Sequence, residues 1–262
     1  MDSELTYSSY LRLSELLGLQ TLQSDRAGDP EHDEMLFIVI HQVYELWFKQ
    51  LLHELDHVID LLDDDDVVRA SRGLRRVLTI LKVMVSQMDV LETMSPMEFL
   101  SFRERLESSS GFQSAQFREF EFVLGHKRNE VVSVFADDTA ASERLRQRLE
   151  SPSLWFAVCE FLRRAGFDLG SRPAIADATN SSVEVQEALL QVYRSDHDVS
   201  DLCERLVDLD EGVQEWRYRH VKMVERTIGH KMGSGGSSGV EYLTSTLGRP
   251  VFPDLWAIRS RL

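Results

Sequence analysis

The chain has 262 residues, of which 43% are hydrophobic and 28% are charged, and its formal net charge is -15. These proportions are ordinary for a globular protein with a sizeable core. The acidic excess disfavours nucleic acid and anionic membranes as partners, because both carry negative charge. No apolar run approaches the roughly 20 residues of a membrane-spanning helix, and the acidic N-terminus lacks a signal-peptide pattern, so we expect a cytoplasmic protein.

Helical periodicity begins early in the chain and predicts long elements. Apolar residues recur at three- and four-residue spacing over residues 35–62, which indicates a first long helix. Four aspartates at 63–66 interrupt the pattern, and a second long helix is predicted over residues 67–93. A third begins with Ser95 as N-cap and Pro96 at the first helical position.

The second half of the chain continues the same pattern. The segment "FQSAQFREFEFVLG" predicts a helix that stops at Gly125, and "SPSLWFAVCEFLRRAG" repeats the Ser-Pro start and the glycine stop. Residues 183–194 and 200–228 complete the predicted helices. No alternating strand pattern occurs, so the sequence predicts an all-α fold, a single domain over residues 1–262 built as a bundle of long antiparallel helices.

The segment "HELDH" at 53–57 has the H-E-x-x-H spelling of a zinc hydrolase, in which two histidines one helical turn apart bind zinc. Asp56 charges a position that such enzymes usually leave uncharged, and no strong third ligand presents itself. The same face carries Glu45 and Lys49, so a solvated polar stripe is the simpler interpretation.

Two histidines lie on apolar helix faces. His41 shares its face with Phe37, Ile38, Tyr44 and Phe48, and His220 shares its face with Val213, Trp216, Met223 and Val224. Each can be a core histidine satisfied by one hydrogen bond. Together they can instead lie on either side of a planar apolar cofactor with one axial imidazole. Periodicity alone leaves both interpretations open.

Two further features are candidates for contact with a ligand. Arg103 follows Phe99 by one helical turn. It is either a surface arginine whose aliphatic stem covers the core, or its guanidinium binds a carboxylate through two parallel hydrogen bonds. The Gly-Ser segment at 233–239 is not a phosphate-binding loop, because no Lys-Ser or Lys-Thr follows its last glycine. Its glycines allow the backbone to approach a ligand closely.

Three long segments resemble the tryptophan 2,3-dioxygenase family in order and spacing. They are "LFIVIHQVYELWFKQLLHELD", "LETMSPMEFLSFRERLESSSGFQS" and "WRYRHVKMVERTIGHKMGSGGSSGVEYLTSTL", and "TYSSYLRLSELLGLQ" near the start matches as well. Residues 127–210 are much less distinctive. The resemblance implies an all-α, tetrameric enzyme with non-covalent b-type haem, which inserts O2 into the indole C2–C3 bond of L-tryptophan to give N-formylkynurenine.

The resemblance also implies site residues. His220 would be the axial ligand of the haem iron, His41 would hydrogen-bond the indole N–H, and Arg103 would hold the substrate carboxylate. Ser234 would contact the amino acid end of the substrate. The remaining implied positions are pocket residues around indole and haem and two tyrosines contributed by a neighbouring subunit, namely Phe37, Phe99, Ser110, Gly111, Tyr7 and Tyr10.

Two departures from the family pattern leave the reaction outcome open. Ile40 stands where the family usually has a threonine before the distal histidine, and Ser234 stands where its loop usually has a threonine. A monooxygenase of the same family, which makes an oxindole or a hydroxylated indole from tryptophan or a methylated analogue, is therefore the alternative. A haem gas sensor and the zinc hydrolase are the other classes; an amino acid clamp at Arg103 argues against the sensor.

Overall fold

The computed structural model describes residues 4–107, 109, 113–231 and 239–262. Every regular element in this part of the chain is a helix, which confirms the all-α prediction. No helix in the same residues is long and apolar enough to cross a membrane. The elements are α1 Tyr7–Leu11, α2 Leu13–Leu16, α3 Gln23–Arg26, α4 His32–Asp63, α5 Val67–Leu91, α6 Pro96–Arg103, η1 Glu104–Leu106, α7 Ala115–Leu124, α8 Asn129–Ser133, α9 Thr139–Glu150, α10 Leu154–Arg164, α11 Val183–Ser195, α12 His197–Ile228, α13 Val240–Ser245, α14 Pro253–Ala257 and η3 Arg259–Arg261.

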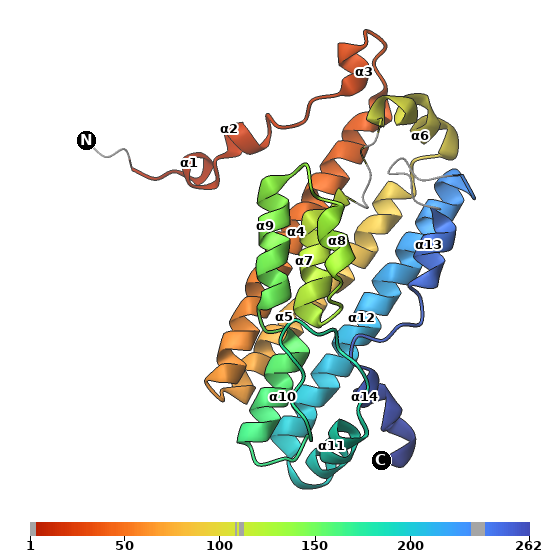
Figure 1. The fold of residues 1–262 in the computed structure, drawn as a ribbon. Helices are drawn as coiled ribbons and strands as arrows, with labels where there is room; N and C mark the ends of the chain where they lie inside the picture. The colour runs from red at the N-terminus through yellow and green to blue at the C-terminus, as the bar shows by residue number, and fades with distance from the viewer. Residues whose placement is uncertain (1–3, 108, 110–112, 232–238) are drawn as a thin grey trace.

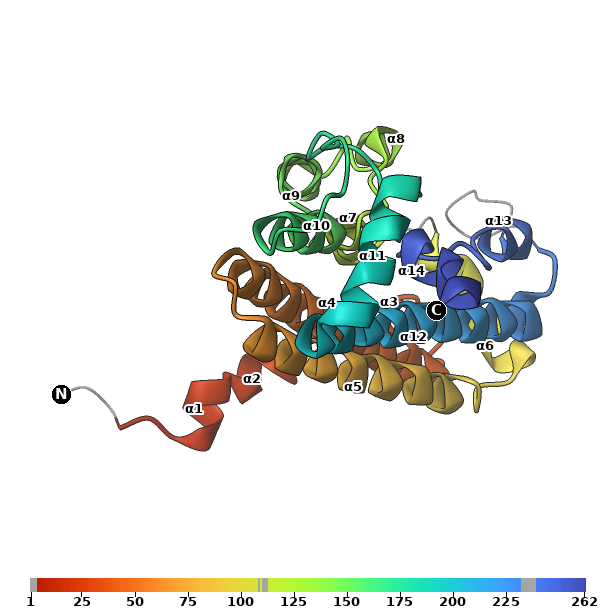
Figure 2. The same cartoon turned by 90° about the horizontal axis from the view of Figure 1, so that it is seen from below.

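Three long helices form the centre of the molecule. Helix α4 runs antiparallel to both α5 and α12, and α5 packs against each of the other two (Figures 1 and 2). Gly73 on α5 allows this close approach, because a Cβ there would lie 2.6 Å from a methyl carbon of Val58 on α4. Helices α7 and α10 cover one side of α4, and α9 packs on α7, while α11 and α14 pack near the first half of α12.

The predicted helix boundaries are confirmed at several points. Ser95 caps α6 in a capping box with Glu98, and Pro96 takes the first position. Helix α7 ends at Gly125, whose φ of 114° is available to glycine at little cost. The expected Ser-Pro start of α10 is wrong by two residues, because Ser153 caps that helix through the N–H of Phe156.

Helix α9 is an element that the sequence prediction missed. Most of its residues are charged or polar, so the short apolar stripe on one face is hard to recognise in the sequence. Ala141, Leu145 and Leu149 recur every four residues and are buried against Phe122 of α7. Asp138 caps the helix through the N–H of Ala141, so both a stripe and a start signal were present in the sequence.

The largest core cluster fills the space between the first half of α12, the second half of α4, α5, α10 and α11. Residues before α3 form an arm that extends away from this body (Figure 1). Its apolar side chains are exposed, with Tyr7 at 77%, Tyr10 at 73% and Leu17 at 74%. Gln20 at the end of the arm donates a hydrogen bond of 2.6 Å to Gln42 on α4, whereas these exposed side chains are available to another surface.

Candidate active site

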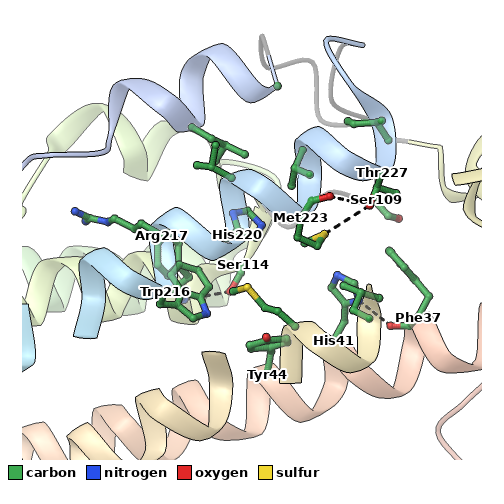
Figure 3. A pocket seen from close by; sticks show the side chains of 18 of the residues that line it. Phe37, His41, Tyr44, Ser109, Ser114, Trp216, Arg217, His220, Met223 and Thr227 are labelled. Carbon is green, nitrogen blue, oxygen red and sulfur yellow. Dashed lines mark hydrogen bonds between the residues drawn. The ribbon is translucent and has the colours of Figure 1, made fainter. Parts of the chain in front are cut away.

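A cavity of about 270 Å³ lies among α4, α5, α6, α7, α12 and α13 (Figure 3). Five of the residues singled out in the sequence line it, although they come from three separate segments of the chain. Aromatic and aliphatic side chains make most of the remaining wall, including Tyr44, Phe48, Met88, Leu91, Phe117, Trp216, Met223 and Val224. The five predicted residues are Phe37, His41, Phe99, Arg103 and His220.

The imidazole of His41 has a defined tautomer. Its Nδ1 lies 2.7 Å from the carbonyl oxygen of Phe37, one turn earlier on α4. A carbonyl only accepts, so Nδ1 carries the proton and Nε2 is an acceptor in the neutral ring. Burial lowers the pKa of His41 below its usual value, although the Phe37 carbonyl and the charge of Glu45 act in the opposite direction. His41 therefore offers a hydrogen-bond acceptor at neutral pH.

His220 lies on α12, on the other side of the cavity from His41 (Figure 3). Burial, followed by the nearby His41 and Arg118, lowers the pKa of His220 to about 4. The ring is parallel to the indole of Trp216 within 4°, with centroids 5.4 Å apart. Phe117 packs against the same indole at 5.1 Å, so the imidazole is backed by an aromatic wall. A neutral imidazole held in this way is a suitable metal ligand.

Aromatic rings enclose the His41 end of the cavity. The ring of Phe37 lies 4.1 Å from that of His41 and 5.7 Å from that of Phe99, measured between centroids. Fully buried Phe102 supports both phenylalanines from behind. This apolar end keeps bulk water away from the acceptor nitrogen of His41 and suits a flat, apolar ring.

Arg103 is the last residue of α6 and the one cation from that helix that lines the cavity in the described structure. The predicted contacts Ser110, Gly111 and Ser234 lie outside the described residues, whereas Ser109 and Gly239 beside them line the cavity. Tyr7 and Tyr10 lie on the exposed arm and take no part in this chain's own cavity wall.

A charged cluster in the cavity wall went unnoticed in the sequence. The carboxylate of Glu121, 6% exposed, contacts Arg118 at 2.8 Å, Arg128 at 2.6 Å and Arg217 at 3.5 Å. Burial would raise the pKa of Glu121, but the arginine charges outweigh it and hold the pKa low. No local signal marks this cluster, because its members are spread over α7, the following loop and α12.

The zinc interpretation of residues 53–57 is wrong. His53 and His57 are exposed, whereas Glu54 is 5% exposed and points the other way. Its carboxylate receives hydrogen bonds from Arg76 at 2.9 Å and Gln50 at 2.7 Å, so it is a structural ion pair between α4 and α5. Among the described residues, no group of three His, Cys, Asp or Glu side chains could hold a metal ion.

Glu45, which was expected to lie on a solvated polar stripe with His53 and His57, is not on that stripe. This carboxylate lines the cavity and accepts a hydrogen bond of 2.8 Å from Gln116 on α7. Four-residue steps drift around a helix of 3.6 residues per turn, so Glu45 and His57, three such steps apart, end on different faces.

The residues of the cavity fit a haem group. A largely apolar space bounded by aromatic rings accommodates a flat macrocycle, and a neutral imidazole on one side can act as its single protein ligand. His41 lies on the opposite side, and its protonated Nδ1 already has a partner in the Phe37 carbonyl. The arginines in the wall suit carboxylate groups on a ligand.

Known proteins resemble this chain over its whole length. The family model for tryptophan 2,3-dioxygenase matches residues 1–172 and 170–262. A tryptophan 2,3-dioxygenase of Herpetosiphon aurantiacus is 58% identical, with 100% of each chain covered. One of Anaeromyxobacter dehalogenans is 52% identical over 100% of this chain and 97% of its own. One of Pseudomonas fluorescens is 42% identical over 98% and 91%. The matches include the segments that carry His41, Arg103 and His220.

Proposed function

This chain belongs to the tryptophan 2,3-dioxygenase family, and we propose that it oxidises L-tryptophan with O2 to N-formylkynurenine. Both oxygen atoms enter the product as the indole C2–C3 bond opens, so the reaction needs no external reductant. The observation that carries the proposal is the placement of His41 and His220 on opposite sides of one apolar cavity, with Arg103 in its wall. The family name alone would leave these residues without roles.

We propose that His220 holds a non-covalent b-type haem. When bound, the haem supplies the iron centre at which O2 is activated. The role of His220 is supported by its neutral imidazole and by the parallel indole of Trp216, which limits rotation of the ring. These properties keep a nitrogen lone pair available at neutral pH.

His41 would orient the substrate as a hydrogen-bond acceptor. Because its Nδ1 proton is already donated to the Phe37 carbonyl, Nε2 is the atom that can receive the indole N–H. The lowered pKa keeps this nitrogen unprotonated. The role is positioning, which fixes the indole ring over the reacting oxygen; no strong base is needed.

Arg103 would bind the carboxylate of tryptophan through its planar guanidinium. Its place at the end of α6, the helix that also carries the paired rings of Phe99 and Phe102, puts a cation at the aromatic end of the cavity. A charge-assisted pair in such a site selects a zwitterionic amino acid over a neutral indole. This clamp also disfavours a gas sensor, because a sensor for a diatomic gas has no need of one.

Monooxygenation is the alternative outcome, and the position of Ile40 bears on it. Ile40 is 6% exposed and packs in the small cluster with Leu91, Met94 and Phe102, and it is not part of the cavity wall. Its apolar side chain thus changes the support of the helix, not the surface that meets the ligand. This favours the dioxygenase outcome.

Labelled O2 distinguishes the two outcomes. Purified protein with ferrous haem, tryptophan and ¹⁸O2 should give a product with two labelled oxygens and the absorbance of a formylkynurenine. A main product with one labelled oxygen and an intact five-membered ring would replace the dioxygenase proposal with the monooxygenase. In that case the double variant Ile40→Thr with Ser234→Thr tests whether the two departures control the outcome.

We also propose a homotetramer in which the arm enters the site of a neighbouring subunit. The support is the exposure of Tyr7, Tyr10 and Leu17 on an arm that extends away from the body of its own chain. Light scattering should give the mass of four chains for the full-length protein, and a monomer for it would contradict the proposal. The cytoplasmic location stays a prediction.

A further inference from the structure

The short helix η1 continues directly from α6 and is bonded to the turn that precedes α4. Arg105 of η1 donates from Nη2 to a carboxylate oxygen of Asp29 at 2.6 Å, and its Nη1 lies 3.9 Å from an oxygen of Glu31. The Arg105 side chain is 24% exposed, so most of it is covered, although Asp29 is itself open to solvent. The guanidinium of Arg105 on η1 is therefore held by two carboxylates from another segment.

The turn that carries these carboxylates is itself fixed. Glu34 accepts hydrogen bonds from the N–H groups of Gln23 at 2.8 Å and Ser24 at 2.9 Å, and the Ser24 hydroxyl accepts from the N–H of Glu31 at 3.1 Å. Glu34 is 1% exposed and Ser24 is fully buried. The turn is thus a rigid anchor on the first residues of α4, and Arg105 is the residue by which η1 reaches it.

We propose that Arg105 is a positioning residue, which fixes the guanidinium of Arg103 by tying the end of α6 to this turn. Arg103 ends a helix of eight residues, and Arg105 follows it by two positions. The start of α6 is fixed by its capping box, and fully buried Phe102 anchors the helix one residue before Arg103. Arg105 adds the constraint on the far side of Arg103, so the backbone of Arg103 is held from both directions.

The consequence concerns ligand selection more than stability. An ion pair with a partner as exposed as Asp29 contributes little to the free energy of folding. A bidentate clamp is different, because a shift of about 1 Å in a positioning group can cost a large factor in binding or rate. Arg105 should therefore affect ligands with a carboxylate and leave ligands without one unchanged. The inference rests on the proposed role of Arg103.

The test compares two ligands on the full-length, haem-loaded protein by calorimetry. L-Tryptophan carries the carboxylate and tryptamine lacks it. Arg105→Gln should weaken tryptophan about three- to tenfold while the dissociation constant of tryptamine stays the same, the range expected for a residue that acts through another. Arg105→Lys should restore part of the loss. Arg69→Gln, which removes a pair with Asp66 at the far end of α5, is the matched control and should change neither constant.

Asp29→Asn tests the same contact from its exposed side and does not depend on how well the Arg105 variant folds. It should weaken tryptophan by a smaller factor, and the double variant should be no weaker than Arg105→Gln alone, because both remove one interaction. Equal weakening of both ligands, or no change in their ratio in either variant, overturns the positioning role. If the wild-type protein itself does not prefer tryptophan to tryptamine, the proposed clamp at Arg103 fails and this inference fails with it.

Discussion

The Nδ1 atom of His41 lies 2.7 Å from the carbonyl oxygen of Phe37, and this single contact decides which nitrogen faces the ligand. Both residues are on α4, so the helix itself sets the tautomer. A histidine with its proton committed to the backbone presents Nε2 as an acceptor. The chemistry expected of His41 follows from this assignment.

The first prediction is that His41→Ala will reduce kcat/KM for tryptophan by about tenfold or more, since a buried N–H loses its acceptor. 1-Methyltryptophan, which has no indole N–H, should be a poor substrate of the wild-type protein. The ratio of kcat/KM between the two substrates should shrink in the variant. An unchanged ratio would mean that Nε2 of His41 does not receive the indole proton.

The second prediction concerns pH. Burial lowers the pKa of His126 to about 4, and its Nε2 has no hydrogen-bond partner in the described structure. Unfolded histidine titrates near 6.5, so between pH 6.5 and 4 the unfolded chain binds a proton that the folded chain does not. The free energy of unfolding therefore decreases as the pH is lowered through this range. Each such histidine contributes a slope of about 1.4 kcal/mol per pH unit. Urea unfolding at pH 7, 6 and 5 measures this slope, and His126→Gln should make it shallower by one proton.

The third prediction is that His220→Ala will abolish normal haem retention. His220 is the one histidine on the α12 side of the cavity in the described residues, so no other histidine there can replace it. Haem per chain and the absorption spectrum after gel filtration are the measurements. His53→Ala, on the solvent face of α4, should leave both unchanged. A wild-type spectrum in His220→Ala would show that another residue is the ligand.

The fourth prediction is that Glu121→Gln will destabilise the protein by about 3–5 kcal/mol, because removing one partner leaves buried positive charge uncompensated. Arg118 and Arg217 are only 5% and 7% exposed, so solvent cannot replace the carboxylate. Denaturant unfolding measures the change. Glu143→Gln removes a surface pair with Arg146 at 3.5 Å and should cost less than about 1 kcal/mol. Equal effects in the two variants would contradict the argument.

The long helices could be predicted from the sequence because burial of one helix face makes apolar residues recur with the helical period, whichever element that face packs against. Helix α5 was expected over residues 67–93 and spans Val67–Leu91, and Gly125 ends α7 where a glycine stop was read. The apolar period is hard to recognise where the buried stripe is narrow, as in α9, whose stripe has three apolar residues among many charged ones. The single domain over residues 1–262 stays a prediction.

The site could be predicted only in part for a different reason. His41 and His220 stand on apolar faces, which a sequence displays, but nothing local says that the two faces meet across one cavity. The resemblance to a family supplied that pairing. Glu121 and its arginines escaped notice because charge within "REFE" is typical of a surface, and burial of those charges depends on contacts from α12.

The largest core cluster is completed without the cavity. Of its buried members, Phe48 alone also lines the cavity in the described structure. The side chains that drive collapse therefore need no ligand in the cavity to find their partners. Folding of this chain and filling of its cavity are thus separate events, and the chain should reach its folded state with the cavity empty.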